Sequence, residues 1–140
     1  MSLEQLKKIR SRRMDQCVIE LQEQRRILAE QEATLRARQQ QLVEFGRWRL
    51  QYQESLFAKL QDQPFTPQAL LDYQKVLQQL SQEEQRLREQ LGAAEQALQT
   101  AYTQVQAAQQ NSKVANLKLE KIKEIIKTQV AQTNHEEPAQ

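Results

Sequence analysis

Few side chains in this sequence are of the types that carry out catalysis or bind metal ions. The chain has one cysteine, Cys17, and one histidine, His135. A catalytic triad or a zinc site needs several such groups converging on one point. Free cysteine is among the most often buried residue types, so we expect Cys17 in a core, with a reactive thiol as the alternative. We therefore predict a protein that is not an enzyme and holds no metal ion or cofactor.

Charged side chains are the other candidates for function, and the basic ones gather near the two ends of the chain. The net charge is only +2, but the first cluster is Lys7, Lys8, Arg10, Arg12 and Arg13, and the second is Lys113, Lys118, Lys121, Lys123 and Lys127. The acidic residues are more frequent in the middle. Basic clusters of this kind are either an ordinary solvated surface or a contact for an acidic partner or phosphate.

The composition shows what kind of element carries these charges. Only two glycines and three prolines occur in 140 residues, and 28 residues are glutamine, which favours long helices over a compact globule. The mean hydropathy is −0.84, and no apolar run approaches the roughly 18 residues of a membrane span. The opening residues also lack the apolar stretch of a signal peptide, so we expect a cytoplasmic protein without membrane insertion.

One strong break divides the sequence, at Pro64 and Pro67. Two prolines this close cannot lie inside a continuous helix without loss of hydrogen bonds. Thr66 followed by Pro67 is a good helix start, with Thr as the cap and Pro at the first helical position. The sequence therefore predicts helices over 2–61 and 67–131, a turn at 62–66, and a disordered polar tail at 132–140 that includes His135.

The second helix has an apolar residue alternately three and four positions apart. Its seam contains Leu70, Tyr73, Leu77, Leu80, Glu84, Leu87, Leu91, Ala94, Leu98, Ala101, Val105, Ala108, Ser112, Ala115, Leu119, Ile122 and Ile126. Only Glu84 and Ser112 are not apolar. A 3.5-residue repeat held over eight heptads predicts a left-handed supercoil with a partner helix.

The first helix has a rougher seam of the same kind. Leucine or methionine recurs every seven residues from Met14 to Leu56, with Arg49 as the exception. The companion positions are Cys17, Gln24, Gln31, Arg38, Phe45 and Tyr52, so this seam is partly polar. Leu3, Leu6 and Ile9 extend the stripe toward the N-terminus in a slightly shifted frame.

The two seams match if the chain folds back once at the turn. The numbers of facing residues then add to about 129, so that Leu42 meets Leu87 and Leu28 meets Ala101. Large residues face small ones, which fills the core while the helix axes approach closely. We predict a single all-α domain over 1–140, an antiparallel coiled-coil hairpin of two long helices. This topology brings both basic clusters to the open end of the hairpin.

The turn end has a different composition, because six of the seven aromatic residues of the expected helices and turn lie near it. They are Phe45, Trp48, Tyr52, Phe57, Phe65 and Tyr73. Part of this group fits the seam and closes the core. Trp48, Phe57, Leu71 and Val76 do not fit the seam, and apolar side chains off the seam of a thin hairpin indicate a contact surface.

Several short stretches resemble one family of proteins. They are Leu3-x-x-Leu6-x-x-Ile9-Arg10 with Arg12-Arg13, Phe45-Gly46-Arg47-Trp48-Arg49, and Leu71-Asp72-Tyr73-Gln74-x-x-Leu77-x-x-Leu80. Together with the expected hairpin, they resemble the stalk proteins of type III secretion, the YscO group of injectisomes and the flagellar FliJ group. The injectisome branch is the closer in character.

This resemblance implies a central stalk that links the hexameric export ATPase to the export gate, at the cytoplasmic side of the inner membrane of a bacterium. Such proteins act as monomers, and some bind free secretion chaperones. Contact with the acidic ATPase ring would fall to Lys7, Lys8, Arg10, Arg12, Arg13, Lys118, Lys121 and Lys123. In the flagellar branch the gate contact lies just after the turn, at positions that map here to Val76, Leu80, Glu83 and Leu87. Val76 and Leu80 from this set, combined with the off-seam aromatic residues Trp48 and Phe57, are the predicted gate residues. Leu80 and Leu87 also lie in the seam.

Two other functions fit the same pattern. A structural or oligomerising scaffold would extend its seam outward into a four-helix bundle. A nucleic-acid-associated coiled coil would use the basic clusters on phosphate, with strong salt dependence. The chain has no basic helix that continues into a parallel leucine zipper and no group of aromatic side chains on which bases could stack. Nucleic acid is therefore the least favoured of the three kinds of partner.

Overall fold

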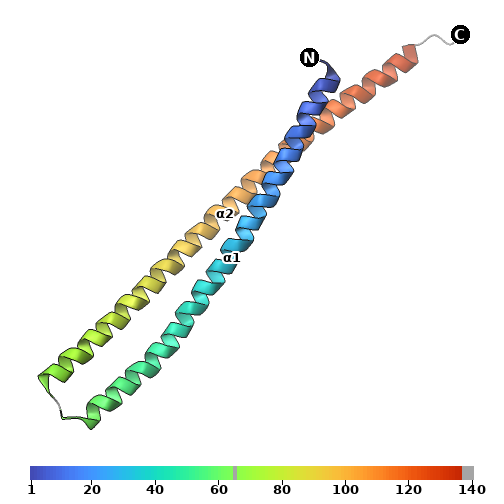
Figure 1. Ribbon diagram of the computed structural model, residues 1–140. Helices are drawn as coiled ribbons and strands as arrows, with labels where there is room; N and C mark the ends of the chain where they lie inside the picture. Colours follow the sequence, from blue (N-terminus) through green and yellow to red (C-terminus); the bar gives the residue numbers. More distant parts are fainter. Residues whose placement is uncertain (65, 137–140) are drawn as a thin grey trace. The chain divides into compact units, whose positions relative to one another are not determined.

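A computed structural model describes residues 1–64 and 66–136 of the chain. Within them it contains two helices, α1 (Leu3–Asp62) and α2 (Pro67–Glu136), and no strand. The two helices pack against each other in antiparallel directions, so the predicted all-α hairpin is confirmed (Figure 1). Phe65, in the predicted turn, and the last four residues of the predicted tail lie outside the described residues.

Both helices begin with a cap that the local sequence provides. The Ser2 hydroxyl accepts a hydrogen bond from the Gln5 N–H at 3.1 Å, and the Gln5 side chain accepts one from the Ser2 N–H at 3.0 Å. This reciprocal pair is a capping box. At the second helix the Thr66 hydroxyl accepts from the Ala69 N–H at 3.1 Å. The predicted cap at Thr66 is therefore confirmed, and the two start sites are defined by side chains.

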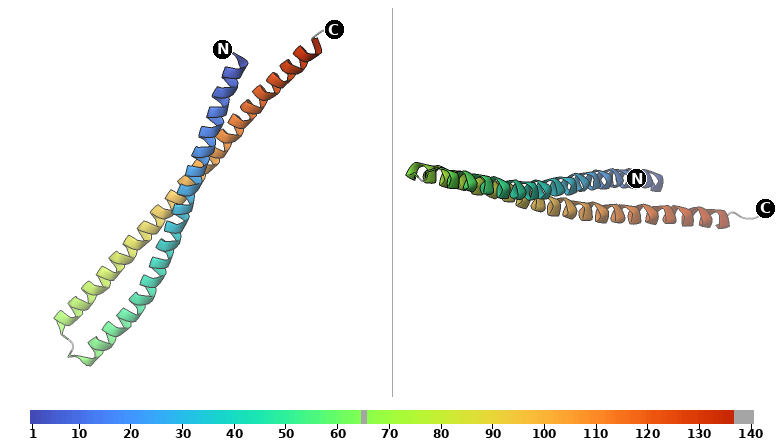
Figure 2. Two further views of the ribbon diagram at one scale, coloured as in Figure 1. Left: turned by 45° about the vertical axis from the view of Figure 1, so that its right-hand side comes forward. Right: turned by 90° about the horizontal axis from the view of Figure 1, so that it is seen from below.

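The end of α2 lies later than the sequence analysis predicted. The tail was expected from residue 132, but the helix continues to Glu136. Extending an existing helix costs no new nucleation, and no helix-breaking residue occurs before Pro138. The seam of α2 is apolar only as far as Ile126, which would face Leu3 at the start of α1. The last turns of α2 continue beyond that start (Figure 2).

The hairpin contains two compact units of equal length. Unit 1 combines residues 1–29 with 100–140, and so holds both chain ends and both basic clusters. Unit 2 is the continuous stretch 30–99 and holds the turn. Each unit takes one segment from each helix, and each is described below by itself.

The predicted seam of α2 accounts for the core of both units. Nine buried apolar residues lie on α2: Leu80, Leu87, Ala94, Ala101, Val105, Ala108, Ala115, Leu119 and Ile122. Every one of them is a seam position of the 3.5-residue repeat. On α1 the buried residue is Cys17, again at a seam position, as expected. The spacing of the apolar residues therefore predicted the packed face of each helix.

Bonds between the helices confirm the register. In unit 1 the Arg10 guanidinium donates to the Lys118 carbonyl oxygen at 3.0 Å, and in unit 2 Arg38 donates to the Gln90 side chain at 3.2 Å. The numbers in both pairs add to 128, close to the predicted 129. The N-terminal frame needs one correction, because Ile9 is exposed while Arg10 is half-buried. The aliphatic stem of Arg10 covers the seam, and its charged end reaches a backbone oxygen.

Candidate interaction surfaces

The basic residues of unit 1 lie on two helix segments that pack together. Lys8, Arg12 and Arg13 on α1 are exposed, and Lys7 and Arg10 are half-buried. On α2, Lys118, Lys121 and Lys123 are all exposed. Arg13 and Lys118 line the same shallow surface recess, together with Asn111, Val114 and Ala115. The structure therefore brings side chains of both clusters onto one surface of unit 1, as the antiparallel topology requires.

Some of these cations are already engaged within the chain. Arg10 holds the Lys118 carbonyl oxygen, and the Lys123 ammonium lies 3.5 Å from a Glu120 carboxylate oxygen. No ion pair involves Arg12, Arg13 or Lys121 among the described residues. The three free charges are therefore better placed for a partner than Arg10 and Lys123, a distinction that residue types alone do not make.

The two units differ in the sign of their charge. Unit 1 carries twelve Lys and Arg residues against eight Asp and Glu, a net charge of +4. Unit 2 carries eight against ten, a net charge of −2. A small overall charge thus conceals a positive unit and a negative one, and the positive unit is the one that would attract an acidic surface.

Unit 2 contains a cross-helix ion pair that the sequence analysis did not anticipate. Arg49 and Glu84 are two of the polar residues in the predicted seams. The Arg49 guanidinium binds the Glu84 carboxylate and, at 3.1 Å, the Ser81 hydroxyl. Arg88 binds the other oxygen of Glu84 at 3.1 Å. The side chains of Arg49 and Glu84 are 20% and 30% exposed. A polar pair inside a seam favours one register over its alternatives.

Trp48 lies on one side of unit 2. Its ring stacks on Tyr52 with centroids 4.9 Å apart and contacts Phe45 at 5.8 Å. One apolar edge of the indole is thereby held in a fixed orientation while the ring remains exposed. Offset aromatic contacts of this kind are favourable beyond the area they bury.

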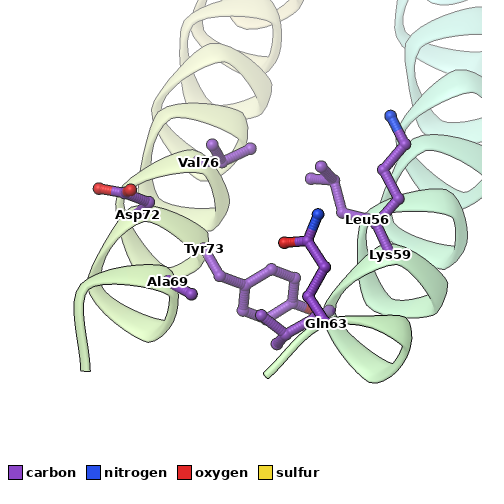
Figure 3. A pocket seen from close by; sticks show the side chains of 8 residues that line it. Leu56, Lys59, Gln63, Ala69, Asp72, Tyr73 and Val76 are labelled. Atoms are coloured by element: carbon purple, nitrogen blue, oxygen red, sulfur yellow. The ribbon is translucent and has the colours of Figure 1, made fainter. Parts of the chain in front are cut away.

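Val76 lines a recess of about 240 Å³ near the turn. The recess lies between the helices, with Leu56 and Lys59 on α1, Gln63 just after α1, and Ala69, Asp72 and Tyr73 on α2 (Figure 3). The Tyr73 ring extends from α2 into the space between the helices. Lys59 and Asp72 put one charge of each sign at the rim.

Trp48 on α1 and Val76 on α2 each stand one position before a seam residue. Antiparallel packing places these two positions on the same side of unit 2, which is here called the tryptophan face.

The four predicted gate residues do not form one surface. Phe57 is nine residues from Trp48, or about two and a half helical turns, so the two side chains project from opposite sides of α1. Phe57 is 51% exposed and does not line the recess of Val76. Leu80 is only 6% exposed, because it packs in the seam. The structure therefore leaves Trp48 and Val76 together, Phe57 apart from them, and Leu80 out of reach of a partner.

Two exposed apolar residues accompany Phe57 and were missed by the sequence analysis. They are Val43 and Leu50, both on α1. Each stands one position after a seam residue, seven residues from the next, so Val43, Leu50 and Phe57 lie along one line of the helix. Leu71 occupies the equivalent position on α2 and is also exposed. The seven-residue spacing was available in the sequence but was hidden beside the stronger seam.

In the part of the chain that the structure describes, the remaining chemistry-bearing residues do not assemble into a metal site. Over the described residues, no group of three or more His, Cys, Asp or Glu side chains is placed to hold a metal ion. Neither helix, as far as it is described, has a stretch apolar and long enough to cross a membrane. The side chain of His135 lies outside the described residues.

The sequence matches one family over almost its whole length. The family model described as "Type III secretion protein YscO" matches residues 3–140. None of the curated proteins and none of the solved structures matches the chain. The matched range includes both helices, the turn and both basic clusters, and the match agrees with the resemblance in the short motifs. The chain belongs to the YscO family of type III secretion proteins.

Proposed function

We propose that this protein is a non-enzymatic stalk and adaptor of a bacterial type III secretion system. In this proposal unit 1 binds the hexameric export ATPase, and unit 2 contacts the cytoplasmic domain of the export gate. The protein stands in the cytoplasm beside the inner membrane and acts on these partners as a single copy. Secretion chaperones are a third class of partner that the same exposed surfaces could receive.

The observation that supports this proposal most is the uneven charge of the two units. Unit 1 has a net charge of +4, and Arg12, Arg13 and Lys121 are exposed without an intrachain ion pair among the described residues. Complementary charge raises the rate of encounter with an acidic surface and disfavours partners of the same sign. An acidic inner surface of an ATPase ring is a partner of the required sign.

The gate contact is assigned to the tryptophan face of unit 2. Trp48 is exposed and stacks on Tyr52, and Val76, on the same side, lines the recess nearer the turn. Rigid aromatic side chains beside a concave surface are typical anchors of protein interfaces. Phe57 and Leu80 of the predicted gate set are left out of this contact, because one lies on the other side of α1 and the other is buried.

The test combines the full-length chain with the export ATPase of the same secretion system. We expect the chain to raise the hexameric fraction of the ATPase, measured by sedimentation velocity at low salt. Charge reversal at Arg12, Arg13 and Lys121 should reduce the apparent affinity by about tenfold, because three unpaired charges then repel the acidic ring. Adding Lys123→Glu should have a smaller further effect, since Lys123 already pairs with Glu120.

A matched control reverses exposed basic residues of unit 2. Arg36→Glu with Lys75→Glu changes the net charge as much as reversal of Arg12 and Arg13 alone, and it is compared with that double variant; all four positions are exposed. The control should leave ATPase binding within twofold of the unmodified chain. Equal losses in both variants would show a nonspecific charge effect and end the assignment of the ATPase contact to unit 1.

A further inference from the structure

The line of Val43, Leu50 and Phe57 on α1 is apolar, exposed and unused by the contacts proposed above. These side chains are 48%, 60% and 51% exposed. Seven residues are about 20° short of two full helical turns, so the three side chains lie almost directly above one another. A helix of a thin hairpin has no deeper core to cover such a line, which makes it a surface for another helix.

Gly46 lies on the same side of α1, between Val43 and Leu50 along the helix and about 50° around it from their line. A Cβ atom added there would meet nothing within 4 Å, so packing inside the hairpin does not require a glycine. Glycine in a helix interior is destabilising by about 1 kcal/mol relative to alanine. The absence of a side chain at Gly46 lets a second backbone approach α1 closely beside the apolar line.

The line is also complementary to itself. If two copies of α1 cross in antiparallel directions about Leu50, then Val43 of each copy meets Phe57 of the other, so a small side chain faces a large one. The same two-fold axis places Arg47 of one copy beside Glu54 of the other, twice. Both residues are exposed, and neither has an ion-pair partner among the described residues. Apolar shape and charge therefore agree on one arrangement.

We propose that this surface joins two copies of the chain, with α1 of one copy packed antiparallel on α1 of the other around a two-fold axis at Leu50. The contact is isologous, as in most dimers of identical chains. Three half-exposed side chains per copy bury far less than the roughly 800 Å² per partner of a standard interface. The dimer is therefore weak, with the monomer predominant at micromolar concentration and the dimer present at high local concentration.

The main experiment is sedimentation equilibrium of the full-length chain from about 10 µM to about 1 mM at low salt, a range suited to a small interface. The average mass should rise from 16.5 kDa toward twice that value. Leu50→Glu should abolish the rise, because it places two carboxylates face to face at the axis. A chain that remains monomeric at the highest concentration would overturn the proposal.

Charge exchange identifies the occupant of the surface. Arg47→Glu alone and Glu54→Arg alone should each weaken association by about tenfold, because each places like charges together at both ends of the contact. The double variant R47E/E54R should restore association to within about twofold. This rescue requires that the two positions meet across the axis of two identical chains. Failure of the rescue would assign the surface to a different partner and overturn the dimer.

The glycine supplies a test in which stability and association change in opposite directions. Gly46→Ala should raise the melting temperature of the hairpin, because alanine is the better helix former, and should weaken association at least fivefold, because its methyl group separates the two backbones. Gly92→Ala is the matched control on α2, since a Cβ there also meets nothing within 4 Å. It should raise the melting temperature and leave association unchanged. Equal association in the two variants would contradict the close approach at Gly46.

Discussion

The two units are equal in length, yet they are held together differently. Of the ten buried apolar residues in the described part of the chain, seven lie in unit 1 and three in unit 2. The α2 seam of unit 1 is rich in small residues such as Ala101, Ala108 and Ala115, which let the helices approach and exclude water. Unit 2 has polar residues in its seam and adds hydrogen bonds across it, from Arg38 to Gln90 and from Arg49 to Ser81 and Glu84.

The difference also decides what each unit presents on its surface. Unit 1 keeps the large seam residues Leu119 and Ile122 inside and exposes basic side chains, together with apolar ones such as Ile19 and Leu117. Unit 2 places Arg49 and Glu84 in the seam and exposes Val43, Trp48, Leu50, Phe57 and Leu71. Charge complementarity acts over about 10 Å at 0.1 M salt, whereas apolar contacts act only when water is excluded. The net positive charge of unit 1 is thus suited to electrostatic attraction of a partner, and the exposed Trp48 and Phe57 of unit 2 are suited to short-range docking.

The largest effect should come from the apolar seam of unit 1. Ile122→Ala removes the most deeply buried large side chain of the described residues, which is 1% exposed. A buried isoleucine shortened to alanine costs about 2–5 kcal/mol, through lost apolar burial and the remaining cavity. Urea unfolding followed by far-UV circular dichroism should show the corresponding loss of stability.

Ile125→Ala is the matched control for that substitution. Ile125 lies one helical turn away in the same unit but is 43% exposed. Its replacement should change the free energy of unfolding by no more than about 0.5 kcal/mol, as is usual at exposed positions. Similar losses for the two variants would mean that the seam does not dominate the stability of unit 1.

The sequence predicted the fold well because its strongest signals are local and periodic. The prolines located the turn, Thr66 located the start of α2, and the 3.5-residue repeat identified every buried residue of α2. Two details depended on tertiary context and were missed. Arg10 takes the seam position expected for Ile9, because a long side chain can bury its stem and still bond to the Lys118 carbonyl oxygen. The helix passes residue 131, because a formed helix propagates through polar residues.

The interaction surfaces were predicted less completely, for a geometric reason. Exposure of Trp48 and Phe57 followed from their absence from the seam, and the structure confirms it. Grouping them with Val76 and Leu80 ignored the rotation of 100° per residue, which places Trp48 and Phe57 on opposite sides of α1. For Leu80 the two kinds of sequence evidence disagreed. The family resemblance predicted a contact residue, whereas the heptad frame predicted a core residue, and the structure confirms the core position.

A smaller effect should come from the polar seam of unit 2. Arg49→Leu leaves the half-buried Glu84 carboxylate without its cross-helix partner, and we expect a loss of about 1 kcal/mol, reduced from the value for a fully buried pair by exposure to solvent. Glu84→Leu alone should cost a similar amount. The double variant should recover most of the stability, since two leucines extend the apolar seam.

Trp48 provides the measurement for this cycle, because the chain has one tryptophan and it lies in unit 2. Its emission reports unfolding of the turn-end unit, while circular dichroism reports the helices of both units. The Arg49 and Glu84 variants should shift the emission midpoint more than the ellipticity midpoint. If both single variants are neutral by both probes, the ion pair contributes nothing to the register of unit 2.

The smallest effect concerns two Glu–Arg ion pairs with the same i, i+3 spacing: Glu23 with Arg26 in unit 1, and Glu83 with Arg86 in unit 2. The hydrogen bond from Arg26 lowers the pKa of Glu23 below its ordinary value, and that from Arg86 does the same for the pKa of Glu83. A lowered carboxylate pKa adds stability that is present above the unfolded pKa of about 4.3 and is lost as the pH falls through the lower folded pKa.

Both carboxylates are solvated, so the change in melting temperature between pH 7 and pH 3 should be small. Carboxyl NMR titration should place both pKa values below the ordinary value for glutamate, and Arg26→Gln and Arg86→Gln should return them to it. Because each pair lies within one helix, the two shifts should be alike in both units; a clear difference between them would mean that the packing of the units influences even their solvated surfaces.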